Sequence, residues 1–462
     1  MPCTPQPHQC FHSSLLAGGL ILSSPILAET GALENLSGQW QLEWAGNKQH
    51  SQKLEGQLQL EWEHRFNRGV LDNTAVTAIG RLRLDAEDHL SLDAESPNFS
   101  PASKPLTKTA HRQLELRELY LDTEWFGLYW RLGKQQVVWG QADGLKVLDV
   151  VTPQSYREFI LDEFDDSRIS LWMINVEREI TENASLQFLW IPDTTYHELA
   201  EPGTIYQITS PLRTPSPLSV QQHVGTIVSY PADKPEHWLQ DSDAGLRYTQ
   251  FWRGWDISLN YLYHYRDFYV PYHSLSQPTS ETGATLSIFP QYERAHLLGG
   301  TASNAFGNLT LRTEIGWYNH SYQIAAYRND NPGEDNQGIE ESPELSSVIG
   351  LDWQGFSDSL ISLQWFQSLM TDYHPGMIRD RSEQTLSVLL ERQYAQSTWT
   401  FSLQGLYSLN RNDQLWRPRI SYLWLSDLEV WIGGEIFDGT PEGLYGQFDG
   451  NDRFTIGFEW GI

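Results

Sequence analysis

The sequence is poor in cysteine and in basic residues. Its 462 residues include two cysteines, Cys3 and Cys10, both in the first ten positions. Beyond them the chain can form neither a disulfide nor a thiolate metal site. Lys and Arg together number 31 against 59 Asp and Glu, which gives a net charge of −28. Such acidity excludes a nucleic-acid-binding protein, because binding to phosphates requires a basic surface.

Long apolar runs are also missing. The longest strongly apolar stretch without charge is Leu15–Ala28, LLAGGLILSSPILA. It is shorter than the roughly 20 residues that a membrane-spanning helix needs, which excludes a helical membrane protein. Its length and the small residue at its end are typical of an export signal, so we predict that residues 1–28 are a signal peptide cleaved after Ala28. No Lys or Arg precedes the stretch, and a buried N-terminal helix is the alternative.

Aromatic residues, in contrast, are abundant. The 19 Trp, 21 Tyr and 18 Phe exclude a disordered chain. In segment 54–66, LEGQLQLEWEHRF, every odd-numbered residue is polar. A strand places alternate residues on opposite faces, whereas a helix would spread them around its surface. The same alternation marks 255–266, 309–320 and 453–462, and Leu262 is the one apolar residue on the polar face of 255–266.

The alternating segments predict eighteen β-strands. The first strand and the one at 184–191 show the weakest pattern, so sixteen strands is the alternative. The segments are 36–45, 54–66, 74–85, 112–124, 127–138, 168–177, 184–191, 243–252, 255–268, 291–303, 307–320, 344–354, 359–369, 382–394, 397–409, 414–425, 428–438 and 453–462.

The links between these strands largely alternate between short and long. A soluble sandwich or propeller, the alternative fold, has no reason for this alternation, whereas a transmembrane barrel has short periplasmic turns and long outer loops. We therefore predict one all-β domain over 29–462, a transmembrane antiparallel β-barrel in the bacterial outer membrane. Short links fall at 126–127, 181–184, 253–254, 305–307, 355–358, 395–397 and 426–427; long links fall at 86–111, 139–167, 192–242, 269–290, 321–343, 370–381 and 439–452; the link at 410–413 is short where a long one is expected.

A barrel also meets the physical demands of lipid. Backbone polar groups cannot go unpaired in hydrocarbon, so a membrane-spanning sheet must close on itself. Since only alternate residues then face lipid, a mean hydropathy of −0.46 is expected. The last ten residues alternate and end in Trp460-Gly461-Ile462, which resembles the recognition signal of the barrel-assembly machinery. That machinery, outer-membrane lipid and lipopolysaccharide are predicted partners, and an inner-membrane or periplasmic transport component is a further candidate.

The polar strand faces would line the lumen of such a barrel. Opposed basic and acidic rows across a lumen can set ion selectivity. The alternative is a filled barrel whose interior charges neutralise one another. The pore-lining candidates are Arg131, Arg266, Arg312, Glu314, Arg417, Arg419, Glu429 and Glu435.

The link at 139–167 is the third outer loop and carries an apolar run, Leu145–Val151, which is unusual for a solvated loop. Residues 157–161 could form a short helix. The loop resembles, by position, the third loop of general porins, which folds inward to constrict the pore. An external loop that packs on its neighbours or on lipopolysaccharide is the alternative. If the loop folds inward, its acids face basic wall residues such as Arg131, Arg417 and Arg419; these constriction candidates are Asp162, Glu163, Asp165 and Asp166.

The stretch 131–140, RLGKQQVVWG, with the following Asp143-Gly144 and Val151-Thr152-Pro153, resembles a family of large proteobacterial outer-membrane barrels. These porin-like proteins are of mostly unassigned function and are related to the alginate-export porins. The resemblance implies the barrel fold. Alginate-export lumens are strongly basic whereas this chain is acidic, so we do not infer an anionic polysaccharide cargo from the resemblance.

These patterns predict a porin-like channel for passive transport or export of small polar or charged solutes. Two alternatives stay open: a gated carrier for a hydrophobic or amphipathic compound, and a structural or enzymatic barrel without transport. The sequence has no Walker loop, dinucleotide fingerprint or HExxH motif. We expect no enzymatic activity, no cofactor and no metal site.

Overall fold

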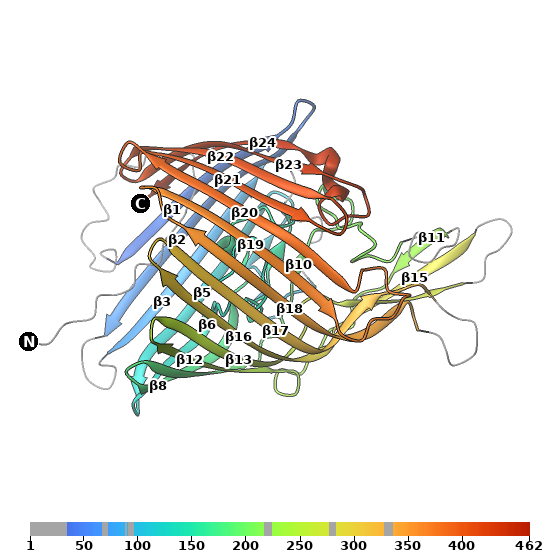
Figure 1. Cartoon of the computed structure of the whole chain (residues 1–462), viewed down its shortest axis with the longest axis horizontal. Coiled ribbons are helices and arrows are strands. Elements are labelled where there is room, and N and C mark those ends of the chain that lie inside the picture. The colour runs from blue at the N-terminus through green and yellow to red at the C-terminus, as the bar shows by residue number, and fades with distance from the viewer. Residues whose placement is uncertain are drawn as a thin grey trace, which may run out of the picture.

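The structure, a computed structural model, describes residues 35–66, 73–87, 90, 97–216, 224–276, 283–327 and 336–462. The predicted signal peptide lies outside these residues. The regular secondary structure of the described chain is almost entirely β-strand, as Figure 1 shows. Among the residues described, no helix is both long enough and apolar enough to cross a membrane.

Strands from the whole length of the chain form one closed ring. The main sheet has nineteen strands; the two-residue β4 (Thr107–Lys108) pairs only with β5, and the other eighteen close the barrel. This confirms the predicted fold class and strand number. The barrel strands are β1 (Leu36–Gly46), β2 (Ser51–Phe66), β3 (Thr74–Asp85), β5 (Arg112–Trp125), β6 (Leu128–Gln135), β8 (Leu171–Thr181), β9 (Ala184–Ile191), β12 (Asp243–Trp252), β13 (Trp255–Tyr265), β16 (Arg294–Phe306), β17 (Leu309–Ile324), β18 (Ile339–Trp353), β19 (Ser359–Met370), β20 (Ser382–Tyr394), β21 (Trp399–Ser408), β22 (Gln414–Leu425), β23 (Leu428–Asp438) and β24 (Arg453–Gly461).

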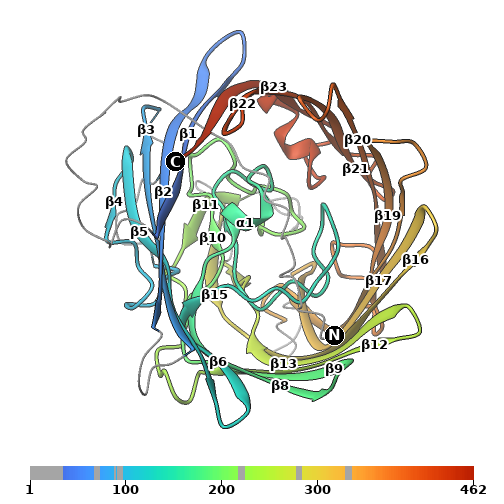
Figure 2. The ribbon, with the colours of Figure 1, turned by 90° about the vertical axis from the view of Figure 1, so that its left-hand side faces the viewer.

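Each barrel strand pairs antiparallel with the next barrel strand in the chain. The ring closes where β1 pairs antiparallel with β24, in a register that sets Trp40 opposite Trp460. Closure leaves the ring without a free edge, so each of its eighteen strands has a hydrogen-bonded neighbour on both sides. Viewed along the barrel from the end where the C-terminus lies, the strands surround an interior that holds further chain (Figure 2).

The two faces of the ring differ in character as the alternation predicts. Leu259 is 61% exposed on the outside of β13, while its neighbour Asn260 is 4% exposed on the inside. Large apolar residues continue around the outer face, and charged residues such as Arg83 and Glu314 lie buried on the inner face. The outer surface is therefore an apolar band around a polar interior.

The two ends of the barrel differ as well. The short turns and the C-terminus share the end at the left of Figure 1, here called the turn end; the longer links share the opposite loop end. The turns Phe126-Gly127 and Arg253-Gly254 have positive φ at both residues, a conformation that matches the twist of the strands they join. Exposed aromatic side chains, Trp125, Phe126, Trp252 and Trp424 among them, gather at the turn end.

Minor elements extend or fill the loop end. β14 (Val270–Leu275), β15 (Ala284–Gln291) and β11 (Val224–Ser229) form a three-stranded sheet that projects beyond the barrel (Figure 1). β7 (Ser155–Tyr156) pairs in parallel with β10 (Glu198–Leu199), which joins the links after β6 and β9. The helix α1 (Phe164–Ser167) lies in the first of these links, and the 3₁₀ helix η2 (Gly446–Asn451) precedes β24.

Candidate functional site

Residues 139–167, here called the inserted loop, lie inside the ring of strands, where Figure 2 shows α1. The apolar run of the loop is buried: Val147, Leu148 and Val151 belong to one core with the barrel wall. Leu262, the residue that breaks the alternation of β13, belongs to this core, which explains why an apolar side chain faces inward there. The other wall residues of the core are Leu171, Met173, Leu189, Ile191, Ala295, Leu297, Tyr318, Val348 and Phe366.

The first part of the loop is also tied to β17 by two charged side chains. The Glu314 carboxylate accepts hydrogen bonds from the backbone N–H of Leu148, at 3.1 Å, and of Gln141. Arg312 donates to the Gln141 carbonyl and forms an ion pair with Asp143. These two pore-lining candidates therefore hold the loop in place.

The stretch that carried the family resemblance forms the root of this loop. Gly133 has φ 134°, and a Cβ there would lie 2.2 Å from the carbonyl oxygen of Leu119, so another residue would clash with β5. Trp139 is fully buried and its indole N–H donates to the Gln187 side chain on β9 at 2.8 Å. This root turns the chain from the end of β6 into the barrel.

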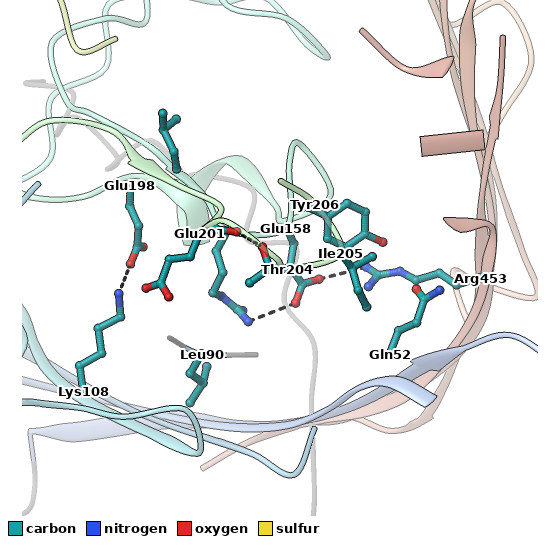
Figure 3. A pocket seen from close by; sticks show the side chains of 12 residues that line it. Gln52, Leu90, Lys108, Glu158, Glu198, Glu201, Thr204, Ile205, Tyr206 and Arg453 are labelled. Atoms are coloured by element: carbon teal, nitrogen blue, oxygen red, sulfur yellow. Dashed lines mark hydrogen bonds and ion pairs between the residues drawn. The ribbon is translucent and has the colours of Figure 1, made fainter. Parts of the chain in front are cut away.

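The far part of the loop carries a buried ion-pair network that the sequence analysis did not include among the site residues. Arg157 pairs with Glu55 of β2 at 2.7 Å, and Glu158 pairs with Lys53 of β2 at 3.2 Å and with Arg453 of β24 at 3.0 Å. Burial raises the pKa of Glu158, but Lys53, Arg453 and Arg157 outweigh it and hold that pKa well below its usual range. Figure 3 shows Glu158 and Arg453 joined in this way.

The predicted helix at residues 157–161 is wrong. The chain there forms turns with Phe159 at φ 56°, and the helix begins later, at Phe164. The reason lies in the contacts of these residues. Arg157 and Glu158 form ion pairs with oppositely charged residues of the wall. The centroid of the Phe159 ring lies 4.9 Å from that of Phe448. Contacts with the barrel therefore override the local helical tendency.

The four constriction candidates reach different parts of the wall. Glu163 lies 3.8 Å from Arg419 of β22, and Asp166 lies 3.4 Å from Arg81 of β3. Asp165 pairs with Arg168 within its own segment. Three of the four acids are thus paired, each with a different arginine. The fourth, Asp162, lines a cavity, and its Oδ2 atom is buried without a hydrogen-bond partner among the described residues.

The remaining pore-lining candidates divide into three groups. Arg417 donates to the Leu161 carbonyl of the loop at 2.6 Å, which adds an anchor on β22. Arg266 and Glu435 make ion pairs with Glu344 and Arg453, at 3.2 and 3.0 Å.

Arg131 and Glu429 lie away from the loop. The guanidinium of Arg131 forms a two-pronged pair with Asp122 at 2.7 and 2.8 Å, so the prediction that it faces the loop acids is wrong. A cross-strand acid satisfies it instead. Glu429 lies near the turn end of β23, opposite Glu459.

The link after β9 enters the barrel beside the inserted loop. Glu198 of β10 accepts from the Ser155 hydroxyl at 2.6 Å and pairs with Lys108 at 2.6 Å. Figure 3 shows Lys108 and Glu198 joined across a small pocket. The two links are therefore joined to each other inside the barrel.

A larger cavity, of about 400 Å³, lies between the inserted loop and the outer halves of the strands. Its lining comes from the inserted loop, from the links after β9 and β13, from the strands β13 and β17 to β21, and from the links after β19, β21 and β23. In the part of the chain that the structure describes, no group of three or more His, Cys, Asp or Glu residues could hold a metal ion.

Toward the turn end, the inner wall is predominantly acidic. Strand alternation places many carboxylates and few basic residues on this face. The acids are Glu61, Glu63, Glu118, Asp122, Glu124, Glu177, Glu179, Asp256, Asp352, Glu391, Glu429 and Glu459, and the basic residues are Arg65, Arg131, Arg247 and Arg312.

A comparison with known families matches one family to most of the barrel. The family described as "Protein of unknown function (DUF1302)" matches residues 36–423, from the first residue of β1 into β22. The chain belongs to the DUF1302 family. None of the comparisons supports the alginate-export relation for this DUF1302 protein, which stays a prediction from the sequence. A comparison with curated proteins gives no match.

Solved structures similar to this DUF1302 protein cover almost the whole chain at low identity. Acinetobacter baumannii OccAB3 is 8% identical with a TM-score of 0.49, and the match covers 93% of this chain and 98% of that one. Pseudomonas aeruginosa OpdK with vanillate is 10% identical with a TM-score of 0.48, over 94% and 100%. Salmonella typhi OmpF in complex with daunomycin is 11% identical with a TM-score of 0.39, over 93% and 97%.

Proposed function

We propose that this protein is an outer-membrane channel for passive transport or export of small polar or charged solutes, and that the inserted loop sets its constriction. The observation that carries the proposal is a closed barrel, apolar outside and polar inside, with a loop tied across the lumen by side chains of the wall.

The outer surface supports the membrane location. A water-soluble barrel would have no reason to expose a continuous belt of Leu, Ile and Phe, whereas lipid requires one. Aromatic rings at the turn end suit the headgroup level of a bilayer. The proposal therefore includes lipid and lipopolysaccharide as the surroundings of the barrel and the assembly machinery as the partner that inserts it.

The interior of the barrel favours a channel function rather than a purely structural one. The loop is held on opposite parts of the wall, by Arg312 and Glu314 on β17 and by Glu158 in the ion-pair network. Charged side chains continue on the wall toward the turn end, where the loop does not cover them. A charged, water-accessible wall beyond a restricting loop is the arrangement of a selective pore.

The first test is the conductance of the purified barrel in a planar bilayer. The wild type should give discrete single-channel steps. The variant Arg157→Gln/Glu158→Gln removes both charges of the loop, while their wall partners keep other ion pairs: Glu55 with Arg83, Lys53 with Glu43 and Arg453 with Glu435. It therefore loosens the loop without leaving an unpaired buried charge. We expect its unit conductance to rise.

The matched control is Lys48→Gln/Glu182→Gln, which removes one exposed charge of each sign from two short links between strands. Its conductance should match that of the wild type. A folded wild-type barrel that never conducts would contradict the proposal.

The second candidate function is a gated carrier for a hydrophobic or amphipathic compound. The apolar core around Leu148 favours it, since a mobile loop would expose an apolar surface to the lumen. Uptake of apolar compounds by a wild-type strain and a deletion strain separates the two functions. Equal uptake by both strains favours the polar channel.

A further inference from the structure

We propose that the cavity of about 400 Å³ binds an organic monoanion, a carboxylate carried on an apolar or aromatic body. This inference rests on the proposed function, since it names a substrate class for the channel. The volume of the cavity falls within the range of about 300–1,000 Å³ that is usual for small-molecule sites.

Three hydrogen-bond donors from two different links surround one aromatic ring in this cavity. The ring is that of Phe268. The guanidinium carbon of Arg213 lies 4.8 Å from its centroid, the His197 ring 4.5 Å and the Tyr156 ring 5.4 Å. The Tyr156 and His197 rings are themselves 5.0 Å apart. All four residues line the cavity.

Each donor has a hydrogen left to give. The Nδ1 atom of His197 accepts the backbone N–H of Gln154 at 2.8 Å, so in the neutral ring the proton sits on Nε2. Among the described residues, neither His197 Nε2, the Tyr156 hydroxyl nor the Arg213 guanidinium has a hydrogen-bond partner. The side chain of Arg213 is exposed to the cavity. The set offers donors without an acceptor, which suits an anion.

The ion pairs of the cavity single out Arg213 as the arginine that can meet the ligand. The other lysine and arginine side chains that line the cavity have carboxylate partners: Lys146 pairs with Asp149 at 2.9 Å, Arg411 with Glu383 at 2.7 Å, and Arg266 and Arg379 with Glu344 at 3.2 and 3.9 Å. Within the described residues, Arg213 is the lining arginine that has only a ring contact. A guanidinium without an ion pair can bind a carboxylate through two parallel hydrogen bonds.

The surroundings of the donors are basic. Burial lowers the pKa of His197 well below its usual value, and Lys146, Arg213, Arg266 and His264 lower it further. Burial also raises the pKa of Asp267, beside the ring, well above its usual range, with a smaller contribution from Asp243.

The rest of the lining suits an apolar body. Ile160, Ile208, Leu212 and Leu444 line the cavity together with Phe268. An aromatic acid can place its carboxylate at the donors and its ring against Phe268. A small hydrophilic anion would leave these apolar groups in contact with water.

The test measures binding of benzoate to the full-length barrel in detergent by titration calorimetry. Benzoate should bind, and benzylamine, which has the same ring and the opposite charge, should not. Arg213→Gln should weaken benzoate binding at least about tenfold, since a charged hydrogen bond is lost. Tyr156→Phe should weaken it about 2–10-fold without changing the shape of the cavity.

The matched control is Arg112→Gln, which removes an exposed arginine at the loop end that does not line the cavity. It should keep wild-type affinity. Heat-modifiable mobility on gels shows whether each variant is folded, and Tyr156→Phe carries the test if Arg213→Gln does not fold. Unchanged affinity in the folded variants, or equal binding of benzylamine, overturns the inference.

Binding in detergent needs no ion flow, so the two proposals can fail separately. A barrel that conducts but does not bind benzoate retains the channel and loses this site. A barrel that binds benzoate through Arg213 but never conducts retains the site and loses the channel.

Discussion

At the scale of single residues, the inner wall holds the inserted loop through groups that water would otherwise satisfy. Glu314 is buried and accepts two backbone N–H groups of the loop. Such N–H groups have no partner within a strand or helix, so a carboxylate from the wall replaces the missing backbone acceptor. A loop without regular structure can therefore be buried inside a barrel.

We predict that Glu314→Ala lowers the free energy of unfolding by about 1–3 kcal/mol, because it leaves the N–H of Leu148 buried and unpaired. Urea-induced unfolding followed by tryptophan fluorescence measures the change. Glu429→Ala, which removes a carboxylate away from the loop, should have little effect. Equal stability of Glu314→Ala and the wild type would show that the loop is not held at β17.

At the scale of elements, the strands follow from the sequence and the path of the loop does not. Lipid on one side and polar groups on the other impose a period of two, which appears directly in segments such as 54–66. Even the weakly patterned strand at 184–191 has the predicted bounds. The local pattern was sufficient because alternate residues of a strand face either lipid or the interior, so each residue type reports the side on which it lies.

The inward course of the loop depends on partners far away in the sequence. Arg157 meets Glu55, and Gln141 meets Glu314, so neither contact leaves a local signal. The apolar run Leu145–Val151 indicated that the loop needs a surface, yet not which surface. An Arg-Glu pair beside an apolar run was the signal for the buried network, but it also fits a short exposed helix. The prediction for Arg131 was wrong for the same reason. Its partner Asp122 lies on the neighbouring strand, and only the register of the two strands shows that they are opposite each other.

We predict that Leu259→Arg impairs assembly, because a charge on the lipid face near the bilayer midplane costs about 2–4 kcal/mol. The inward neighbour Asn260 is packed beneath the loop, so Ser303→Arg is the better control; it faces inward opposite Asp256. Heat-modifiable mobility reports the folded fraction. Equal folding of the two variants would show that the assigned faces of the sheet are wrong.

At the scale of the whole molecule, the barrel has a chemically distinct interior at each end. The loop end carries the inserted loop, the link after β9 and the basic residues that hold them, while the turn end is lined largely by acids. The net charge of −28 is thus unevenly distributed along the barrel axis. In the proposed channel, ions entering from the turn end would meet a field that favours cations.

We predict that the loop end faces the cell exterior. A cysteine at Lys104, exposed at the loop end, should react with an impermeant thiol reagent on intact cells, and a cysteine at Ser426, exposed in a turn, should not. The described residues contain no other cysteine, which keeps the background low. The reverse labelling would invert the orientation of the barrel.

The central claim is that residues 139–167 cross the lumen, and a disulfide between loop and wall tests it most directly. A Cβ placed on Gly144 would lie 3.7 Å from the Cβ of Ser387 on β20, a separation that suits a disulfide. The variant Gly144→Cys/Ser387→Cys, folded in membranes and mildly oxidised, is digested, and the linked peptides are quantified by mass spectrometry. The account predicts a high yield of the 144–387 cross-link; folded barrels in which both thiols remain free would place the loop outside the lumen.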